Sequence, residues 1–292
     1  MGQYSIKELE QLSGIKAHTI RIWEKRHSII SPKRTATNIR FYTDDDLKKI
    51  INISVLNNNG FKISKLIELT EKQLSDKVVE LSASANDNEI HIDQLIKAMI
   101  DMEEESFCKE LSFIIQRVGF ENAVVEVLYP FLKKIGILWH TGNVNPAQEH
   151  FITHLIRQKM IVAIDQLPIP SKKNKKAVLY LAENELHEIG LLFYHYVCRK
   201  MGLRTYYLGQ TVPYNDLKSI CKIHKPDVII VAITTSPKPE DTQDYLSRLA
   251  ADHSNTSILV TGMALAQVSL KKTKNLFLFR DAANLRQVLK TI

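Results

Sequence analysis

A glutamate and a histidine, two residues apart, follow the first strand-like run in the carboxyl-terminal part of the chain. The run Ala177–Leu181 is apolar, Glu185 and His187 come after it, and Gly190 begins the next helical pattern. Open parallel α/β sheets bind ligands at the carboxyl ends of their strands, where this loop would lie. Imidazole is a common metal ligand, and a carboxylate on its other ring nitrogen orients it. The alternative for a lone loop histidine is plain solvent exposure.

The elements that must position this loop alternate between strand-like and helical patterns over residues 174–292. Such alternation predicts a doubly wound parallel sheet, and five strands suit the flavodoxin-like strand order. The expected strands are Ala177–Leu181, Thr205–Leu208, Val228–Ile233, Ser257–Val260 and Leu276–Phe279. The expected helices lie near 189–201, 214–224, 241–251, 265–270 and 283–289.

The preceding segment, residues 91–168, has four amphipathic stretches with short connections, which predicts a four-helix bundle. Gly142 and Pro146 would end the third helix and begin the fourth. Trp139 then lies at the end of the third helix, and Glu149 and His150 lie on the first turns of the fourth.

These bundle residues allow more than one function. Trp139 fits a buried core position, because tryptophan is highly buried on average. His150 and His154 are four residues apart on one helix with Glu149 adjacent, a spacing that could serve a metal, although the sequence offers no clear third ligand.

The amino-terminal residues 1–75 predict a winged helix-turn-helix. Ser5 and Glu8 form a capping box for a first helix that Gly14 ends, and a second helix is expected over about 17–25. Pro32 breaks the chain before an alternating segment around Arg40 that suggests a short hairpin, or wing. Residues 1–43 hold eight Lys or Arg and three acids, the charge pattern of a protein that binds a polyanion.

This module closely resembles the MerR family of transcription regulators. The resemblance is carried, in order, by Tyr4-Ser5-Ile6-Lys7-Glu8-Leu9, Gly14-Ile15, Thr19-Ile20-Arg21-Ile22-Trp23-Glu24-Lys25-Arg26, Pro32-Lys33-Arg34-Thr35 and Arg40-Phe41-Tyr42. It implies contacts with double-stranded operator DNA. The implied contact residues are His18, Thr19 and Arg21 on or near the recognition helix, and Lys33, Arg34, Arg40 and Tyr42 around the wing.

The remaining 200 or so residues resemble the cobalamin-dependent CarH/LitR group within that family. Glu185-x-His187-x-x-Gly190 is similar to the cobalamin signature Asp-x-His-x-x-Gly, and Trp139-x9-Glu149-His150 resembles the helical cap of that group. The resemblance implies adenosylcobalamin held between bundle and sheet domain. His187 would be the lower cobalt ligand, Trp139 would pack on the upper face, and Glu149 and His150 would lie beside it.

By the same resemblance, light would cleave the cobalt–carbon bond and change the assembly of a homo-oligomer, a dimer or a tetramer, so that operator DNA is released. The sensor would then work as a population switch whose favoured oligomer binds DNA multivalently.

The chain departs from the cobalamin signature in three places. Glu185 replaces the usual aspartate, Thr234-Thr235-Ser236 stands where Ser-x-Leu is usual, and Thr261-Gly262 stands where Gly-Gly is usual. Thr234 keeps a hydroxyl and Gly262 keeps a small residue. Two alternatives therefore stay open: a MerR-type regulator with a degenerate sensor that binds no cobalamin, and a corrinoid carrier or enzyme. No constellation of acid, base and nucleophile argues for catalysis.

Composition sets the remaining expectations. The 292 residues suggest several domains: 1–75 for DNA binding, a linker over 76–90 with a small, polar stretch at 82–88, a bundle over 91–168, and a sheet domain over 174–292. No apolar run approaches the ~20 residues that span a bilayer, and no signal peptide is visible, so we expect a cytoplasmic protein. Cys108, Cys198 and Cys221 fit three buried apolar positions better than disulfides or a zinc site.

Overall fold

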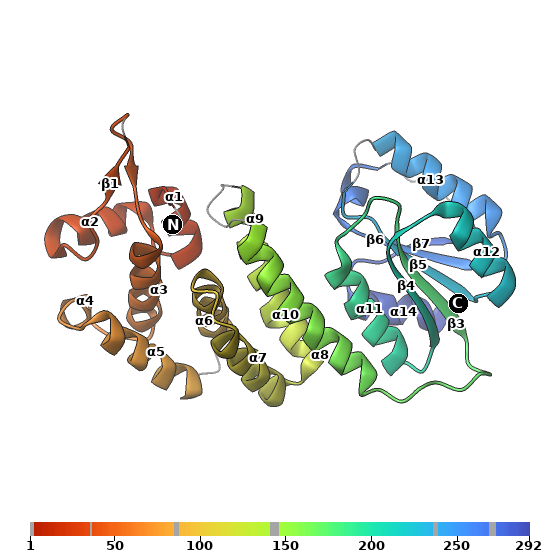
Figure 1. Cartoon of the computed structure of the whole chain (residues 1–292), viewed down its shortest axis with the longest axis horizontal. Coiled ribbons are helices and arrows are strands. Elements are labelled where there is room, and N and C mark those ends of the chain that lie inside the picture. Colours follow the sequence, from red (N-terminus) through yellow and green to blue (C-terminus); the bar gives the residue numbers. More distant parts are fainter. Residues whose placement is uncertain (1–2, 36, 85–87, 141–145, 236–238, 269–272) are drawn as a thin grey trace. The chain divides into compact units, whose positions relative to one another are not determined.

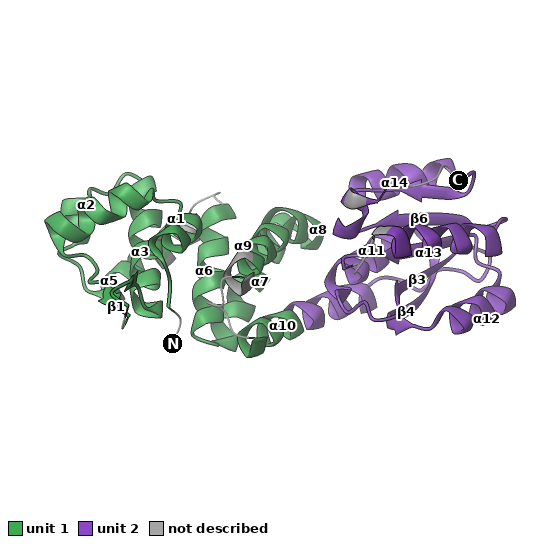
Figure 2. Cartoon of the chain, turned by 90° about the horizontal axis from the view of Figure 1, so that it is seen from above, with its two compact units in different colours: residues 1–155 green, residues 156–292 purple. Residues whose placement is uncertain are grey.

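The computed structural model describes residues 3–35, 37–84, 88–140, 146–235, 239–268 and 273–292, without the side chains of 79, 82–84, 137–140, 239 and 267. It divides into two compact units, residues 1–155 and 156–292 (Figure 2). None of the described helices is both long enough and apolar enough to cross a membrane.

The helix-turn-helix consists of α1 (Ile6–Ser13) and α2 (Ala17–His27) (Figure 1). Ser5 and Glu8 form the expected capping box, and Gly14 ends α1 in the left-handed conformation at φ 72°. Both features satisfy backbone groups that a helix end leaves without partners. Ile20 and Trp23 face the core from α2, so the outer face of this helix is left to polar residues.

The wing is a two-stranded hairpin of β1 (Lys33–Arg34) and β2 (Arg40–Phe41), paired antiparallel. Tyr4 pairs with Tyr42 in an isolated bridge, which fastens the start of the chain to the hairpin. A Thr43–Asp46 capping box then begins α3 (Asp44–Asn58), whose Leu47, Ile50 and Ile51 are completely buried.

Most of the predicted linker is helical. After α4 (Ile63–Leu66), α5 (Glu71–Ser84) extends through the first half of the expected linker, and α6 begins at Asn88. The small residues at 82–84 still have helical backbone, because Ala and Ser are tolerated in a helix when no Gly or Pro interrupts it.

The helical segment that follows has the expected four stretches. It contains α6 (Asn88–Ile100), α7 (Glu104–Val118), a third stretch of α8 (Phe120–Asn122), the π-helix η1 (Ala123–Leu128) and α9 (Tyr129–His140), and then α10 (Pro146–Asp165). Val124, Val127 and Leu128 are buried in η1, and Ile152, Ile156 and Met160 are buried on α10. Pro146 begins α10 as expected, and Gly142, the expected end of the third helix, lies outside the described residues.

Unit 2 contains the five-stranded parallel sheet in the order β4-β3-β5-β6-β7, which confirms the flavodoxin-like topology. Val228–Ala232 is buried throughout, as a central parallel strand covered on both faces must be. The strands are β3 (Lys176–Ala182), β4 (Arg204–Val212), β5 (Val228–Ala232), β6 (Ser257–Thr261) and β7 (Leu276–Leu278).

Helices cover both faces of the sheet (Figure 1). On one face, Leu217 and Cys221 of α12 (Tyr214–His224) and Leu246 and Leu249 of α13 (Pro239–Asp252) pack against β3, β5 and β6. The other helices of this unit are α11 (Glu188–Lys200) and α14 (Ala282–Thr291). Where a helix was expected near 265–270, the described residues form the short 3₁₀ helix η2 (Met263–Gln267), and residues 269–270 lie outside the described part of the chain.

His195 on α11 is a buried titratable group that links stability to pH. Its Nε2 lies 2.8 Å from Thr205 Oγ1 and its ring stacks on Tyr207 with centroids 4.9 Å apart. Burial, with a smaller contribution from Arg199, lowers the pKa of His195 from 6.5 to about 4. The folded protein therefore keeps this imidazole neutral at pH values where the unfolded chain protonates it.

We expect unit 2 to lose stability as the pH falls from 6.5 toward 4. Above the pKa of the unfolded chain, the buried imidazole costs no stability. By pH 5 we expect the free energy of unfolding to be lower by about 2 kcal/mol. Urea unfolding at pH 7.5 and pH 5 should show this loss in the wild type and a smaller loss in His195→Gln, which keeps a polar group near Thr205 but does not titrate. Equal pH dependence in both proteins would contradict the prediction.

Candidate functional site

The loop after β3 is built around the carboxylate of Glu185, which is only 3% exposed. Oε1 of Glu185 accepts hydrogen bonds from the backbone amides of Leu186 and His187, at 3.0 and 3.1 Å. Oε2 accepts from the amides of Thr234 and Thr235, at 2.8 and 2.7 Å, and from the Thr235 hydroxyl at 3.1 Å. One side chain thus joins the loop after β3 to the loop after β5.

Glu185 also holds the histidine. Its Oε1 lies 2.6 Å from Nδ1 of His187, and the His187 side chain is 57% exposed. Glu185 thus contacts the ring nitrogen that the expected orienting carboxylate would bind.

Glu185 is ionised in this setting. Burial by itself would raise the pKa of Glu185, but the hydrogen bonds from His187 and from the amides of Thr235, His187 and Thr234 outweigh it, and the pKa falls from 4.5 to about 2. A carboxylate on Nδ1 fixes the orientation of the ring and makes Nε2 the nitrogen that would ligate a metal.

Four further residues hold this loop and the helix start after it, and no sequence pattern indicated them. Gln210 donates from Nε2 to the carbonyl oxygen of Leu186 at 2.6 Å. Glu188, in the first turn of α11, accepts from Arg157 Nε at 2.7 Å and from the Tyr207 hydroxyl at 2.8 Å. The loop that carries His187 is therefore held from β4, from α10 and from the β5 loop, which reduces the freedom of the imidazole.

The two glycines of the predicted site serve different purposes. A Cβ on Gly190 would have no atom within 4 Å, so the fold itself leaves space at this helix start beside His187. A Cβ on Gly262 would lie 2.0 Å from the carbonyl oxygen of Ile233, and the backbone at Gly262 has φ 124°. Gly262 is required by the close approach of two backbones, whereas no contact requires a glycine at Gly190.

Thr234, Thr235 and Thr261, where the chain departs from the cobalamin signature, make backbone contacts that hold the loops together. The amides of Thr234 and Thr235 bind Glu185, as described, and Ser236 lies outside the described residues. Thr261 is buried at the end of β6, where its carbonyl oxygen accepts from the amide of Ile233 at 2.8 Å. The backbones of Ile233 and Gly262 are thus in direct contact next to this position.

The predicted site residues of unit 1 are placed only in part. Trp139 is at the end of α9, and its side chain lies outside the described residues. Glu149 and His150 are on the first turns of α10, with Oε2 and Nδ1 3.0 Å apart, and Glu149 also accepts from the Thr153 hydroxyl at 2.9 Å. Within the described part of the chain, no three His, Cys, Asp or Glu side chains gather to hold a metal, so the alternative with His154 lacks a third ligand.

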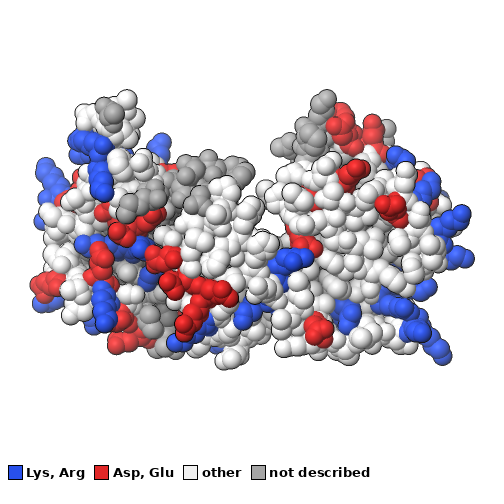
Figure 3. Space-filling model, in the orientation of Figure 1, with Lys and Arg blue, Asp and Glu red and all other residues white. Residues whose placement is uncertain are grey.

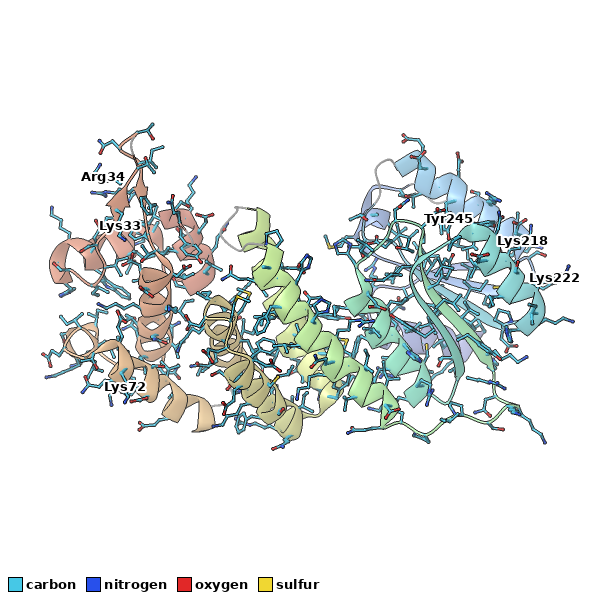
Figure 4. The ribbon with its side chains drawn as sticks, in the orientation of Figure 1. Lys33, Arg34, Lys72, Lys218, Lys222 and Tyr245 are labelled. Carbon is cyan, nitrogen blue, oxygen red and sulfur yellow. The ribbon has the colours of Figure 1, made fainter. Side chains whose placement is uncertain are left out.

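The residues predicted to contact DNA lie mostly on exposed surface. His18 and Arg21 are exposed on α2, and Lys33, Arg34 and Arg40 are exposed on the wing, where Figure 4 labels the first two. Thr19 is half-buried, and its hydroxyl lies 3.3 Å from Nε2 of His18. Arg34 also binds the side-chain oxygen of Asn38 at 2.8 Å, across the turn of the hairpin.

Tyr42 does not fit the DNA contact that was expected of it. Its side chain is 0% exposed and its hydroxyl donates to Glu24 at 3.1 Å. A fully buried ring has no surface to offer DNA, so Tyr42 belongs to the core that supports the wing.

Comparison with known protein families accounts for two segments of the chain. Residues 4–73 match the MerR HTH family regulatory protein, and residues 91–163 match the B12 binding domain. The chain joins a MerR-type DNA-binding domain to a B12-binding domain. The MerR-type domain includes α1, α2, the wing and α3, and the matched B12-binding segment covers the helical bundle.

Two relatives extend across both domains. The chain is 28% identical to the HTH-type transcriptional repressor CarH of Myxococcus xanthus over 252 residues, which is 84% of each chain. It is 24% identical to the HTH-type transcriptional repressor CarA of the same organism, over 82% of this chain and 80% of CarA. The similarity therefore continues past the bundle into the sheet domain that carries His187.

A solved structure confirms the fold of the second half. The monomethylamine corrinoid protein of Methanosarcina barkeri superposes with a TM-score of 0.57 at 15% identity, covering 70% of this chain and 100% of that one. At this identity the likeness shows the fold alone.

Proposed function

We propose that this protein is a DNA-binding transcription regulator that senses cobalamin, with His187 as the cobalt ligand. The observation that carries the proposal is the Glu185–His187 pair, because a buried, ionised carboxylate holds Nδ1 of an exposed imidazole at 2.6 Å. The MerR-type and B12-binding matches and the similarity to CarH and CarA support the same function. Both relatives are transcriptional repressors by name, and repression is the mode of action we propose.

The residues of the loop fit a corrin cofactor. Glu185 would keep Nε2 of His187 directed at the metal, and the open space at Gly190 would admit the ligand beside the helix start. Adenosylcobalamin is the form we propose, and it would supply a cobalt–carbon bond that light can cleave. Trp139, Glu149 and His150 are proposed contacts of the same cofactor, on the strength of the Trp-x9-Glu-His resemblance.

The proposed output is a change in assembly. If bound cofactor favours one homo-oligomer, the DNA-binding domains of that oligomer engage operator DNA together, and their combined affinity exceeds that of a single domain. We propose no catalytic activity for the chain, and its partners are then operator DNA and further copies of itself.

The test is a spectrum of the purified protein after reconstitution with adenosylcobalamin in the dark and desalting, followed by illumination. We expect the wild type to retain a corrin spectrum that changes with light. His187→Ala should retain less cofactor and show an altered visible spectrum, because the metal loses its nitrogen ligand.

A matched control is His224→Ala, which removes an imidazole from the opposite end of the same sheet domain. Loss of corrin in both variants would indicate general damage to the domain. If the wild type retains no corrin, the proposal fails and a MerR-type DNA binder with a different sensor ligand remains.

A further inference from the structure

The amino-terminal edge of the sheet in unit 2 carries a dense group of basic residues. Three segments enter the sheet there, residues 171–176 before β3, 199–204 before β4 and 222–227 before β5. Together they hold nine Lys or Arg and one acid, Asp227. We call this surface the basic edge. Its members are Lys172, Lys173, Lys175, Lys176, Arg199, Lys200, Arg204, Lys222 and Lys225.

Contacts show that these three segments adjoin one another. Lys176 is the register partner of Arg204, and the amide of Arg204 donates to the carbonyl oxygen of Lys175 at 2.9 Å. Nζ of Lys176 donates to the carbonyl oxygen of His224 at 3.0 Å, which brings the end of α12 to the same place. The basic edge is therefore one continuous surface of a single unit.

The side chains of this edge reach solvent. Lys172, Lys173, Lys175, Lys200, Lys222 and Lys225 are all exposed. Blue side chains gather along the lower right of unit 2 in Figure 3, and Figure 4 shows Lys222 directed outward from α12, one turn after Lys218. Lys218 pairs with Asp252 at 3.0 Å, so it contributes less uncompensated charge than Lys222.

Helix ends account for only part of this charge. Cations are favoured in the last turn of a helix, where Arg199, Lys200 and Lys222 lie. Lys172, Lys173 and Lys175 precede a strand and gain nothing from a helix dipole. The opposite edge has the opposite sign, because residues 183–188 carry three Glu and no Lys or Arg.

We infer that the basic edge of unit 2 binds DNA phosphates, as a contact in addition to the MerR-type domain. Duplex DNA presents closely spaced phosphates, and clustered lysines on an open surface neutralise them without reading sequence. The inference rests on the proposed function, since a regulator already held on DNA by one domain brings the second surface to high local phosphate concentration. It would contribute affinity and salt dependence and leave sequence choice to α2 and the wing.

The experiment is a fluorescence anisotropy titration of full-length protein with a fluorescein-labelled duplex of mixed sequence, over a range of KCl concentrations. The test variant is Lys173→Gln with Lys222→Gln. The control variant is Lys109→Gln with Lys133→Gln, which removes the same charge from exposed positions in the bundle. A third variant, Arg21→Ala with Arg40→Ala, weakens the MerR-type contact.

We expect the test variant to bind DNA several-fold more weakly, with the slope of log K against log salt reduced by up to about 2, because each lost phosphate contact removes about 0.9. The control should match the wild type. If test and control variants bind alike while Arg21→Ala with Arg40→Ala loses binding, the basic edge makes no DNA contact and the proposed function stands. If the arginine variant binds like the wild type, the MerR-type contact fails instead.

A vesicle assay separates DNA from a membrane surface. Sedimentation with phosphatidylserine–phosphatidylcholine vesicles should show no difference between test and control variants. Loss of vesicle binding in the test variant, with DNA binding unchanged, would overturn the inference.

Discussion

Replacing Gly262 by alanine should unfold most of unit 2 under conditions where the wild type is stable. The new Cβ would lie 2.0 Å from the oxygen and 2.5 Å from the carbonyl carbon of Ile233, and both atoms belong to backbone that cannot move aside. The backbone at Gly262, with φ 124° and ψ 160°, also lies in a region that only glycine populates readily. We expect a loss of more than about 4 kcal/mol, measured by urea unfolding followed by far-ultraviolet circular dichroism.

Gly190→Ala provides the matched control. A Cβ at Gly190 meets no atom within 4 Å, and alanine favours a helix over glycine by up to about 1 kcal/mol. Stability should therefore stay the same or rise, while retention of adenosylcobalamin falls, because the methyl group would occupy space that the proposed cofactor uses. A stable Gly262→Ala protein would show that the contact with Ile233 relaxes.

Replacing Glu185 by glutamine should damage both the loop framework and the cofactor site. The NH2 group of glutamine would face donors on either oxygen position: the amides of Leu186 and His187 on one, or those of Thr234 and Thr235 on the other. Losing a buried carboxylate that pairs with several donors costs about 3 kcal/mol or more. Urea unfolding at pH 7 should show this loss, and reconstitution should show weaker corrin retention, because Nδ1 of His187 is no longer held.

The pH dependence of this stabilisation identifies its source. The folded pKa of Glu185 is about 2, compared with 4.5 for the ordinary group, so the stabilisation is present above pH 4.5 and is lost as the pH falls toward 2. In that interval the difference in the free energy of unfolding between the wild type and Glu185→Gln should shrink. Glu183→Gln, an exposed residue in the same loop, should change stability by less than about 0.5 kcal/mol. Equal effects of the two substitutions would contradict the assigned role of Glu185.

Local signals in the sequence were sufficient for most of the fold. Features that depend only on residues close in sequence can be identified from a pattern. They include the capping residues Ser5 and Thr43, the turn at Gly14 and the apolar runs of the strands. Two local patterns were less informative. The small residues at 82–84 have helical backbone within α5, because Ala and Ser do not break a helix, and after β6 the described residues form only the 3₁₀ helix η2.

The sequence motif predicted the contact between Glu185 and His187, and it did not predict the other contacts of the site. Glu185 and His187 are two residues apart, and their contact follows from that spacing. The donors from Thr234 and Thr235, and the fastening of Glu188 by Arg157 and Tyr207, join segments far apart in sequence whose side chains have no distinguishing pattern. For Tyr42 the sequence pattern was misleading. Its place beside basic residues suggested contact with DNA, but its side chain is completely buried.

Because the carboxylate of Glu185 binds both the loop after β3 and the loop after β5, the order of one loop and ligand binding at the other are thermodynamically coupled. Any ligand that holds the ring of His187 in one orientation also restrains the Glu185 carboxylate, because Oε1 binds Nδ1 of His187 while Oε2 accepts from the amides of Thr234 and Thr235. By linkage, whatever orders the β5 loop must raise the affinity at the imidazole by the same factor, and whatever loosens that loop must lower it. Affinity for the sensed molecule can therefore be tuned from residues 234–235 without altering the histidine.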